Sequence, residues 1–175
     1  MPDPTLSAAI KEAYAVAPST DVIYHTLELW QAVFSAPLRL VLDNADISAK
    51  IEASAARDPG AMVTFTAYAF SLVPPDLSAT ALPQCTIEID NVNRDILVQL
   101  DAAVFATGPV TLIYREYLSS DLTSGPENDP PLEMEITQIT ATPLRIRTVA
   151  GFANLQDKRF PALDYNLETF PGLLQ

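Results

Sequence analysis

The chain has 175 residues, 22 of them acidic and 10 basic, which gives a formal net charge of −12. That charge argues against binding to nucleic acid or to an anionic membrane surface, because both depend on Lys and Arg side chains that neutralise phosphates. A single cysteine, Cys85, and a single histidine, His25, exclude an intrachain disulfide, a thiolate metal cluster and a histidine-rich metal site.

The first predicted element is a helix near residues 6–16. Apolar side chains recur there every three or four residues, with Thr5 placed to cap the helix and Pro18 to end it. No basic region followed by an apolar run precedes it, so we expect no secretory signal and a protein that folds in a cytoplasm. No apolar stretch approaches the roughly 18 residues that a membrane span requires, so we expect none.

Strands dominate the next part of the chain. Segments 22–30 and 38–42 predict a first pair of strands, whereas 46–55 is ambiguous between a strand and a short helix. An Asp-Pro-Gly turn at 57–61 leads into one long predicted strand over 62–73.

The second half of the chain alternates between the same kinds of element. We predict a strand at 84–90, where Cys85 lies on the apolar face as a small buried hydrophobe and not as a reactive thiolate. The remaining predictions are a helix near 94–105 and strands at 110–118, 132–139 and 144–150, the last two forming an antiparallel hairpin. The polar, acidic segment 119–131 separates the first two of these three strands.

These elements predict a mainly β (α+β) fold, an antiparallel β-sandwich or split barrel with two packing helices. We expect residues 1–156 to form a single β-rich domain and 157–175 to form an extended C-terminal arm. Prolines in the arm disfavour a helix, and its large apolar side chains need a surface to cover them. That surface is either the arm's own domain or a neighbouring subunit, and the side chains proposed for inter-subunit contact are Phe160, Tyr165, Phe170 and Leu173.

The residue types that carry chemistry are sparse. His25 is the only obvious general base, no serine lies in a glycine-flanked elbow, and five glycines could hardly build a phosphate loop. We therefore expect a hydrogen-bonded structural histidine, no catalytic residue, no cofactor and no metal. Calcium is the alternative for the carboxylates, either at Asp90, Asp95 and Asp101 or at Asp121, Glu127 and Asp129; the simpler interpretation is a helix-start charge for Asp95 and a solvated loop for the second group.

Four segments carry a family resemblance over nearly the whole chain. They are LSAAIKEAYAVAP near the start, IDNVNRDIL (89–97), YLSSDL (117–122) and GFANLQDKRFPALDYNLETFPGL (151–173). In this order they resemble a family of uncharacterised phage proteins classed as a domain of unknown function, whose members occur in the tail modules of long-tailed phages and prophages.

The resemblance implies a structural minor tail protein of the tail tip or baseplate, a distal-tail or hub component without enzymatic activity. It implies a β-sandwich or split barrel similar to tail-tube proteins, hexameric or trimeric rings, and the tail tube, tape measure and hub as partners. The protein would be assembled in the bacterial host cytoplasm and reside in the virion tail. Two other functions stay open, a β-sandwich module that binds carbohydrate or a cell surface, and a cell-wall hydrolase.

Overall fold

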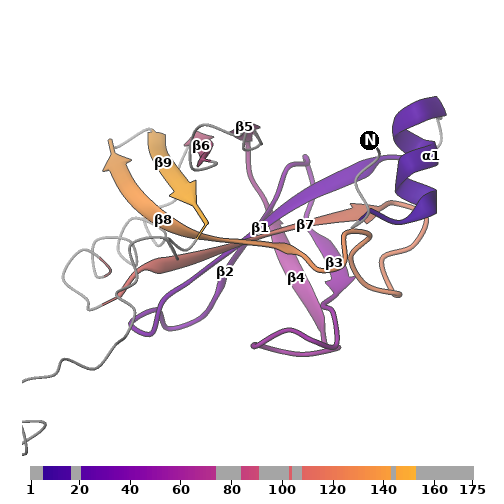
Figure 1. The fold of residues 1–175 in the computed structure, drawn as a ribbon, viewed down its shortest axis with the longest axis horizontal. Coiled ribbons are helices and arrows are strands. Elements are labelled where there is room, and N and C mark those ends of the chain that lie inside the picture. Colours follow the sequence, from indigo (N-terminus) through magenta and orange to yellow (C-terminus); the bar gives the residue numbers. More distant parts are fainter. Residues whose placement is uncertain are drawn as a thin grey trace, which may run out of the picture.

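The computed structural model describes residues 6–16, 21–73, 84–90, 103, 108–142 and 145–152. It is mainly β, as the sequence predicts. Within these residues the helix α1 (Ala8–Val16) precedes the strands β1 (Ile23–Trp30), β2 (Leu38–Val41), β3 (Ile47–Lys50), β4 (Met62–Ala67), β5 (Phe70–Val73), β6 (Gln84–Asp90), β7 (Val110–Leu118), β8 (Leu132–Ala141) and β9 (Arg145–Gly151) (Figure 1).

All the strands belong to one open sheet in the order β3-β4-β2-β1-β7-β8-β9-β6-β5. Neighbouring strands are antiparallel, including the predicted pairs β1–β2 and β8–β9, except that β2 and β4 run parallel. The segment 46–55, ambiguous in the sequence, contributes the strand β3. The sheet is therefore mixed, although most of its pairs are antiparallel as expected.

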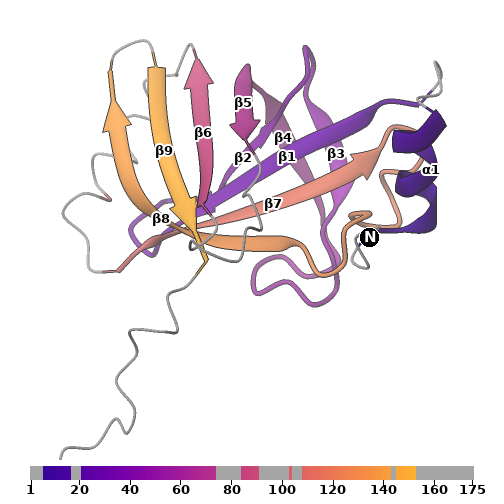
Figure 2. The ribbon, with the colours of Figure 1, turned by 45° about the horizontal axis from the view of Figure 1, so that its top comes forward.

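The sheet turns back over itself at β8. The first half of β8 pairs with β7 and the second half with β9, and a register irregularity between Ile136 and Gln138 separates the two halves. Such bulges bend a strand and increase its twist. Figure 2 shows the result, a layer of β8, β9, β6 and β5 that crosses over the long β1–β7 pair.

The prediction of one long strand over 62–73 is wrong, because this segment bends at Tyr68 and Ala69 into β4 and β5. These two strands lie near opposite ends of the strand order. At the bend, the Tyr68 amide donates to the Val41 carbonyl at 2.9 Å, and the Asp90 amide donates to the Ala69 carbonyl at 3.0 Å. The bend thereby joins the two layers covalently and by hydrogen bonds, an arrangement between a sandwich and a barrel.

The main core fills the space between the layers. Its buried side chains come from both of them, with Leu27, Leu29 and Leu112 on one side and Ile87, Ile89 and Ile146 on the other among its members. Cys85 lies in this core with no exposed surface, and burial raises the pKa of its thiol to about 11. The sequence-based interpretation of Cys85 as a buried hydrophobe is confirmed.

A second core covers the other face of β1 and β7. Phe65 and Tyr117 pack there with ring centroids 5.9 Å apart, together with Val41 and Ile51. Val41 is fully buried although it alternates with Leu40, which lies in the main core. Both faces of β2 are therefore covered at this end, whereas alternation along a strand usually leaves one face in water.

α1 closes the end of the β1–β7 pair (Figure 1). Ile10 and Ala13 pack against Leu118 at the end of β7. The helix is capped by Ser7, whose hydroxyl accepts a hydrogen bond from the Ile10 amide at 3.2 Å. Thr5, the predicted cap, lies outside the described residues.

Two further predictions fall largely outside the described residues. Of the predicted helix 94–105, only Ala103 is described, and it is helical and buried in the main core. The arm 157–175, with Phe160, Tyr165, Phe170 and Leu173, lies wholly outside them.

Candidate functional site

The outer face of β1, β2 and β7 carries a group of paired ions with a buried centre, which we call the charge cluster. It contains Glu28, Arg39 and Arg115 from the three strands and Glu52, Arg57 and Asp58 from the turn after β3. The side chains of Glu28 and Arg115 are each only 1% exposed. Three arginines and three carboxylates balance one another, as burial of this many charges demands.

Glu28 lies at the centre of the charge cluster. One carboxylate oxygen accepts from Arg115 at 3.1 Å and from Arg39 at 3.2 Å, and the other accepts from Arg57 at 3.3 Å. Arg115 also donates two hydrogen bonds to Glu52, at 2.7 and 2.9 Å. This two-point pairing fixes the orientation of the guanidinium group as well as its charge.

The charge cluster fastens the turn over residues 52–60 to the sheet. Arg57 bonds to Glu28 and also lies 5.1 Å from the centre of the Trp30 ring. Burial opposes the charge of Arg115, but the hydrogen bond to Glu52 and the charges of Glu28 and Glu52 outweigh it and raise the pKa of Arg115. All its members are thus engaged with one another, so the charge cluster is a structural element and not a reactive site.

A second polar group surrounds Glu116 near the end of β7. One carboxylate oxygen of Glu116, Oε1, accepts hydrogen bonds from the Tyr14 hydroxyl at 3.0 Å and from the Tyr114 hydroxyl. His25 Nδ1 lies 2.7 Å from the Tyr114 oxygen, and the two rings stack at 11°. Because the Tyr114 hydroxyl donates to Glu116, His25 Nδ1 is the donor to Tyr114.

The two oxygens of Glu116 differ in their surroundings. Oε2 is buried and has no hydrogen-bond partner among the described residues. The Glu116 side chain is 9% exposed, and His25 Nδ1, at 3.8 Å from Oε1, is the nearest basic nitrogen recorded for it. Burial, then the charge of Glu116, raises the pKa of both Tyr14 and Tyr114, so both hydroxyls stay protonated and remain donors.

Glu116 lines a cavity of about 450 Å³, which we call the Glu116 cavity. Its wall is mostly apolar, with the carboxylates of Glu116 and Glu133 and the amide of Asn128 as polar points. The other lining residues are Leu6, Tyr114, Pro130, Pro131, Leu132 and Phe152. An apolar wall with a few convergent polar groups is the usual composition of a binding site.

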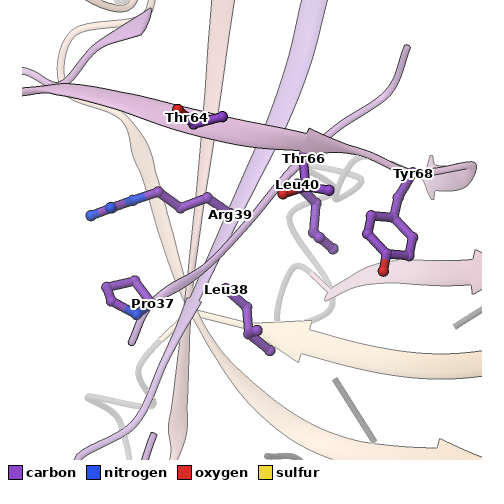
Figure 3. Close-up of a pocket in the computed structure, with 7 residues that line it drawn as sticks. All are labelled: Pro37, Leu38, Arg39, Leu40, Thr64, Thr66 and Tyr68. Atoms are coloured by element: carbon purple, nitrogen blue, oxygen red, sulfur yellow. The ribbon is translucent and has the colours of Figure 1, made fainter. Parts of the chain in front are cut away.

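A smaller groove of about 240 Å³ opens between β2 and β4 (Figure 3). These parallel strands pair only at Leu40–Thr66 and Val41–Ala67, so they diverge toward Pro37 and Thr64. Figure 3 shows Arg39, the two threonines and the Tyr68 ring around the groove. Arg39 is already bonded to Glu28 and Asp58. The groups that the groove offers to a ligand are therefore the threonine hydroxyls and the Tyr68 ring.

The acidic segment 119–131 is folded onto the protein, and the prediction of a solvated loop is wrong for part of it. Asn128 is 5% exposed; its side chain accepts from the Glu116 amide at 3.0 Å and donates to the Tyr114 carbonyl at 3.1 Å. Asp121 accepts hydrogen bonds from the Ser124 hydroxyl and from the amides of Thr123 and Ser124. The segment therefore braces the end of β7 and forms part of the cavity wall.

The predicted site residues have separate outcomes. His25 is hydrogen-bonded within the Glu116 group, as expected for a structural histidine. No three His, Cys, Asp or Glu side chains gather as a metal site within the part of the chain that the structure describes. Asp90 pairs with Arg145, whereas Asp95 and Asp101 lie outside the described residues. No helix that the structure describes is long and apolar enough to cross a membrane.

The charge cluster and Glu116 were both missed by sequence reasoning. Alternation along β7 places Glu116 on the face that carries Val110 and Leu112, and an acidic residue at such a core-facing position was the available signal. Arg115 gave no comparable signal, since a charged residue on the opposite face is the normal pattern of a half-exposed strand.

We expect Arg115→Met to lower the free energy of unfolding by about 3–5 kcal/mol, because it leaves Glu28 and Glu52 without their buried partner. The matched control is Arg145→Met, whose exposed pairs with Glu88 and Asp90 should contribute far less, because solvent screens them. Urea unfolding followed by Trp30 fluorescence measures both. Equal losses would contradict the structural role of the charge cluster.

The Asp121 turn should respond to acid. Its hydrogen bonds, that from the Ser124 hydroxyl first, lower the pKa of Asp121 to about 2. Because the folded pKa lies below the unfolded value of about 3.9, the turn is stabilised above pH 4 and loses that stabilisation as the pH falls toward 2. A carbon-13 NMR titration of the Asp121 carboxyl group measures the midpoint, and a midpoint near 4 would show that these bonds do not hold in solution.

Comparison with known proteins gives the family but no activity. No curated protein matches the sequence. Residues 9–165 match the model of a family described as a domain of unknown function, DUF1833. This match covers most of the chain and agrees with the resemblance to a domain of unknown function, and the protein therefore belongs to the DUF1833 family.

Proposed function

We propose that the protein is a structural minor tail protein of a tailed bacteriophage or of a prophage-derived particle. It forms a ring in the tail tip or baseplate, between the tail tube and the hub, and has no enzymatic activity. The proposal starts from the resemblance of the four quoted segments to phage tail-module proteins. Membership of DUF1833 is compatible with it but adds no activity.

The observation that carries the proposal is the open edge of β5. This strand pairs with β6 along one edge, and no strand pairs with its other edge among the described residues. Val73 on this strand is 61% exposed. An unpaired strand edge is a template for the strand of another chain, so sheets of neighbouring copies can continue one another around a ring.

The opposite end of the sheet is less open. At the edge strand β3, the Lys50 amide donates to the Leu122 carbonyl at 2.9 Å, and the Tyr117 hydroxyl donates to the Lys50 carbonyl at 3.0 Å. This difference gives the subunit two unlike edges. Unlike surfaces that meet head to tail generate a ring when the rotation between copies closes.

The distribution of charge supports a role around a DNA passage. All five described arginines form ion pairs with carboxylates of the same chain. The net charge of −12 is therefore carried by acidic side chains that these arginines do not balance. An acidic ring lumen repels DNA phosphates and eases their passage.

In this proposal the partners are identical copies in a hexamer or trimer, together with the tail tube, the tape measure and the hub. The protein is assembled in the bacterial host cytoplasm and resides in the virion tail. The inter-subunit contacts are made by the β5 edge and by Phe160, Tyr165, Phe170 and Leu173 of the C-terminal arm.

The DNA on both sides of the gene tests this proposal directly. We expect a long, helix-coding tape-measure gene upstream and a cell-wall peptidase or large host-recognition gene downstream. This order is expected because tail proteins that meet in the particle are encoded together. Neighbouring genes of metabolism or secretion would contradict the tail assignment.

Deletion of residues 157–175 should lower assembly more than folding. The arm follows the described sheet, so its loss removes no described core side chain, whereas the ring loses its proposed apolar contacts. Sedimentation velocity measures assembly, and urea unfolding measures stability. A full-length variant with serine at 160, 165 and 170 is the matched control for chain length; normal rings from both variants would contradict a role of the arm.

A second candidate function is a carbohydrate-binding module. It is favoured by the groove in Figure 3, where the Tyr68 ring and the hydroxyls of Thr64 and Thr66 offer the stacking and hydrogen bonding that sugars use. Saturable glycan binding that Tyr68→Ala abolishes would favour this candidate over the ring component.

A further inference from the structure

The charges in the wall of the Glu116 cavity set a first requirement for an occupant. Glu116 Oε2 is buried without a hydrogen-bond partner among the described residues, while Oε1 accepts two hydrogen bonds. A cationic donor is the strongest hydrogen-bond partner for a carboxylate in such a wall. Glu133, exposed in the same wall, adds a second negative charge.

The remaining wall of the cavity sets a second requirement. Leu6, Leu132 and Phe152 contribute apolar surface, and the volume of about 450 Å³ exceeds what one ammonium or guanidinium group fills. The cavity therefore suits a segment that presents a cationic side chain beside an apolar one. No Lys or Arg side chain lines it among the described residues.

We propose that the Glu116 cavity is the docking site of the Lys158–Phe160 segment of the C-terminal arm. Lys158 and Arg159 are the only basic residues after Arg147, and Phe160 follows them directly. Their charges complement Glu116 and Glu133, and the Phe160 ring supplies the apolar part. The occupant is thus a segment of this chain whose chemistry matches both requirements of the cavity.

The position of Phe152 makes this docking geometrically simple. Phe152 is the last described residue before the arm, and it lines the cavity with 37% of its surface exposed. Seven residues from Phe152 to Arg159 span at most about 25 Å when extended. The described chain thus ends at the wall of the cavity, and the Lys158–Phe160 segment is within reach of it.

Which copy of the chain supplies the Lys158–Phe160 segment depends on the assembly state. In an isolated chain the arm enters its own cavity, whereas in the ring it enters the cavity of the neighbouring copy; only this second statement rests on the proposed function. The segment makes the same contacts in both states. Only the copy of the chain that supplies it differs, as in domain swapping.

Disulfide trapping in the full-length chain tests the docking. Leu6→Cys on the cavity wall and Ala162→Cys in the arm form the reporting pair, and the thiol of Cys85 stays buried in the core. On this background we expect K158E/R159E to slow disulfide formation at least about tenfold, because it replaces attraction to the two carboxylates with repulsion. The matched control R145E/R147E makes the same change of net charge on exposed side chains of β9 and should leave the rate unchanged.

A charge swap completes the test. Adding Glu133→Arg to K158E/R159E should restore part of the trapping rate, because it replaces one of the two negative charges in the wall with a positive charge that attracts the acidic segment. Glu133 is exposed, so its replacement leaves the core intact. An unchanged rate in K158E/R159E, or equal slowing in R145E/R147E, overturns the docking of this segment.

The same reporting pair separates this inference from the proposed function. Isotopically labelled and unlabelled chains are mixed, and mass spectrometry of the linked peptides identifies the donor copy. Rings that form without any trapped disulfide overturn the docking and leave the ring proposal standing. Trapping within one chain at every concentration, without rings, supports the docking and overturns the ring.

Discussion

The structure depends on one constraint, that both faces of the central β1–β7 pair are buried. This pair has eight residue pairs in register, and each side chain along it must find a partner on one face or the other. The inner face packs Leu27, Leu29 and Leu112 into the main core. The outer face is covered by the turn after β3, which meets it through the charge cluster, and by β4, whose Phe65 packs against Tyr117.

This constraint explains why ions lie in the middle of a sheet. Glu28 and Arg39 are direct cross-strand neighbours, so the strand pairing brings them together before the turn arrives. Apolar residues of equal volume could fill the same space at no greater cost. The ions instead specify which turn docks and in which orientation, since Glu52, Arg57 and Asp58 of that turn complete the charge cluster.

The sequence predicted the strands well because alternation is a local property. The segments at β1, β6 and β7 have β-forming residues with one regular apolar face, and the structure has strands there. The bend at Tyr68 and Ala69 was not predictable in the same way. Nothing local marks it, because its cause is the pairing of β4 and β5 with strands near opposite ends of the sheet.

The sites were less predictable than the fold, for a related reason. Alternation distinguishes two faces but does not tell whether the second face meets water or another part of the chain. Arg115 and Glu28 therefore resembled solvated residues, although both are fully buried. Asn128, in a segment expected to be solvated, became a buried partner of the Glu116 backbone for the same reason.

The two buried glutamates of the β1–β7 pair differ in how completely the residues around them satisfy their carboxylate oxygens. Glu28 has both oxygens bonded to arginines, and its position is fully determined by residues around it. Glu116 has one oxygen bonded to two tyrosines and the other buried without a described partner, and the residue lines a largely apolar cavity. In the same strand pair, one glutamate thus has hydrogen bonds to both carboxylate oxygens, and the other has them to one oxygen among the described residues. An unsatisfied buried carboxylate opposes folding, so Glu116 is the point of the central pair where a cationic partner would add the most stability.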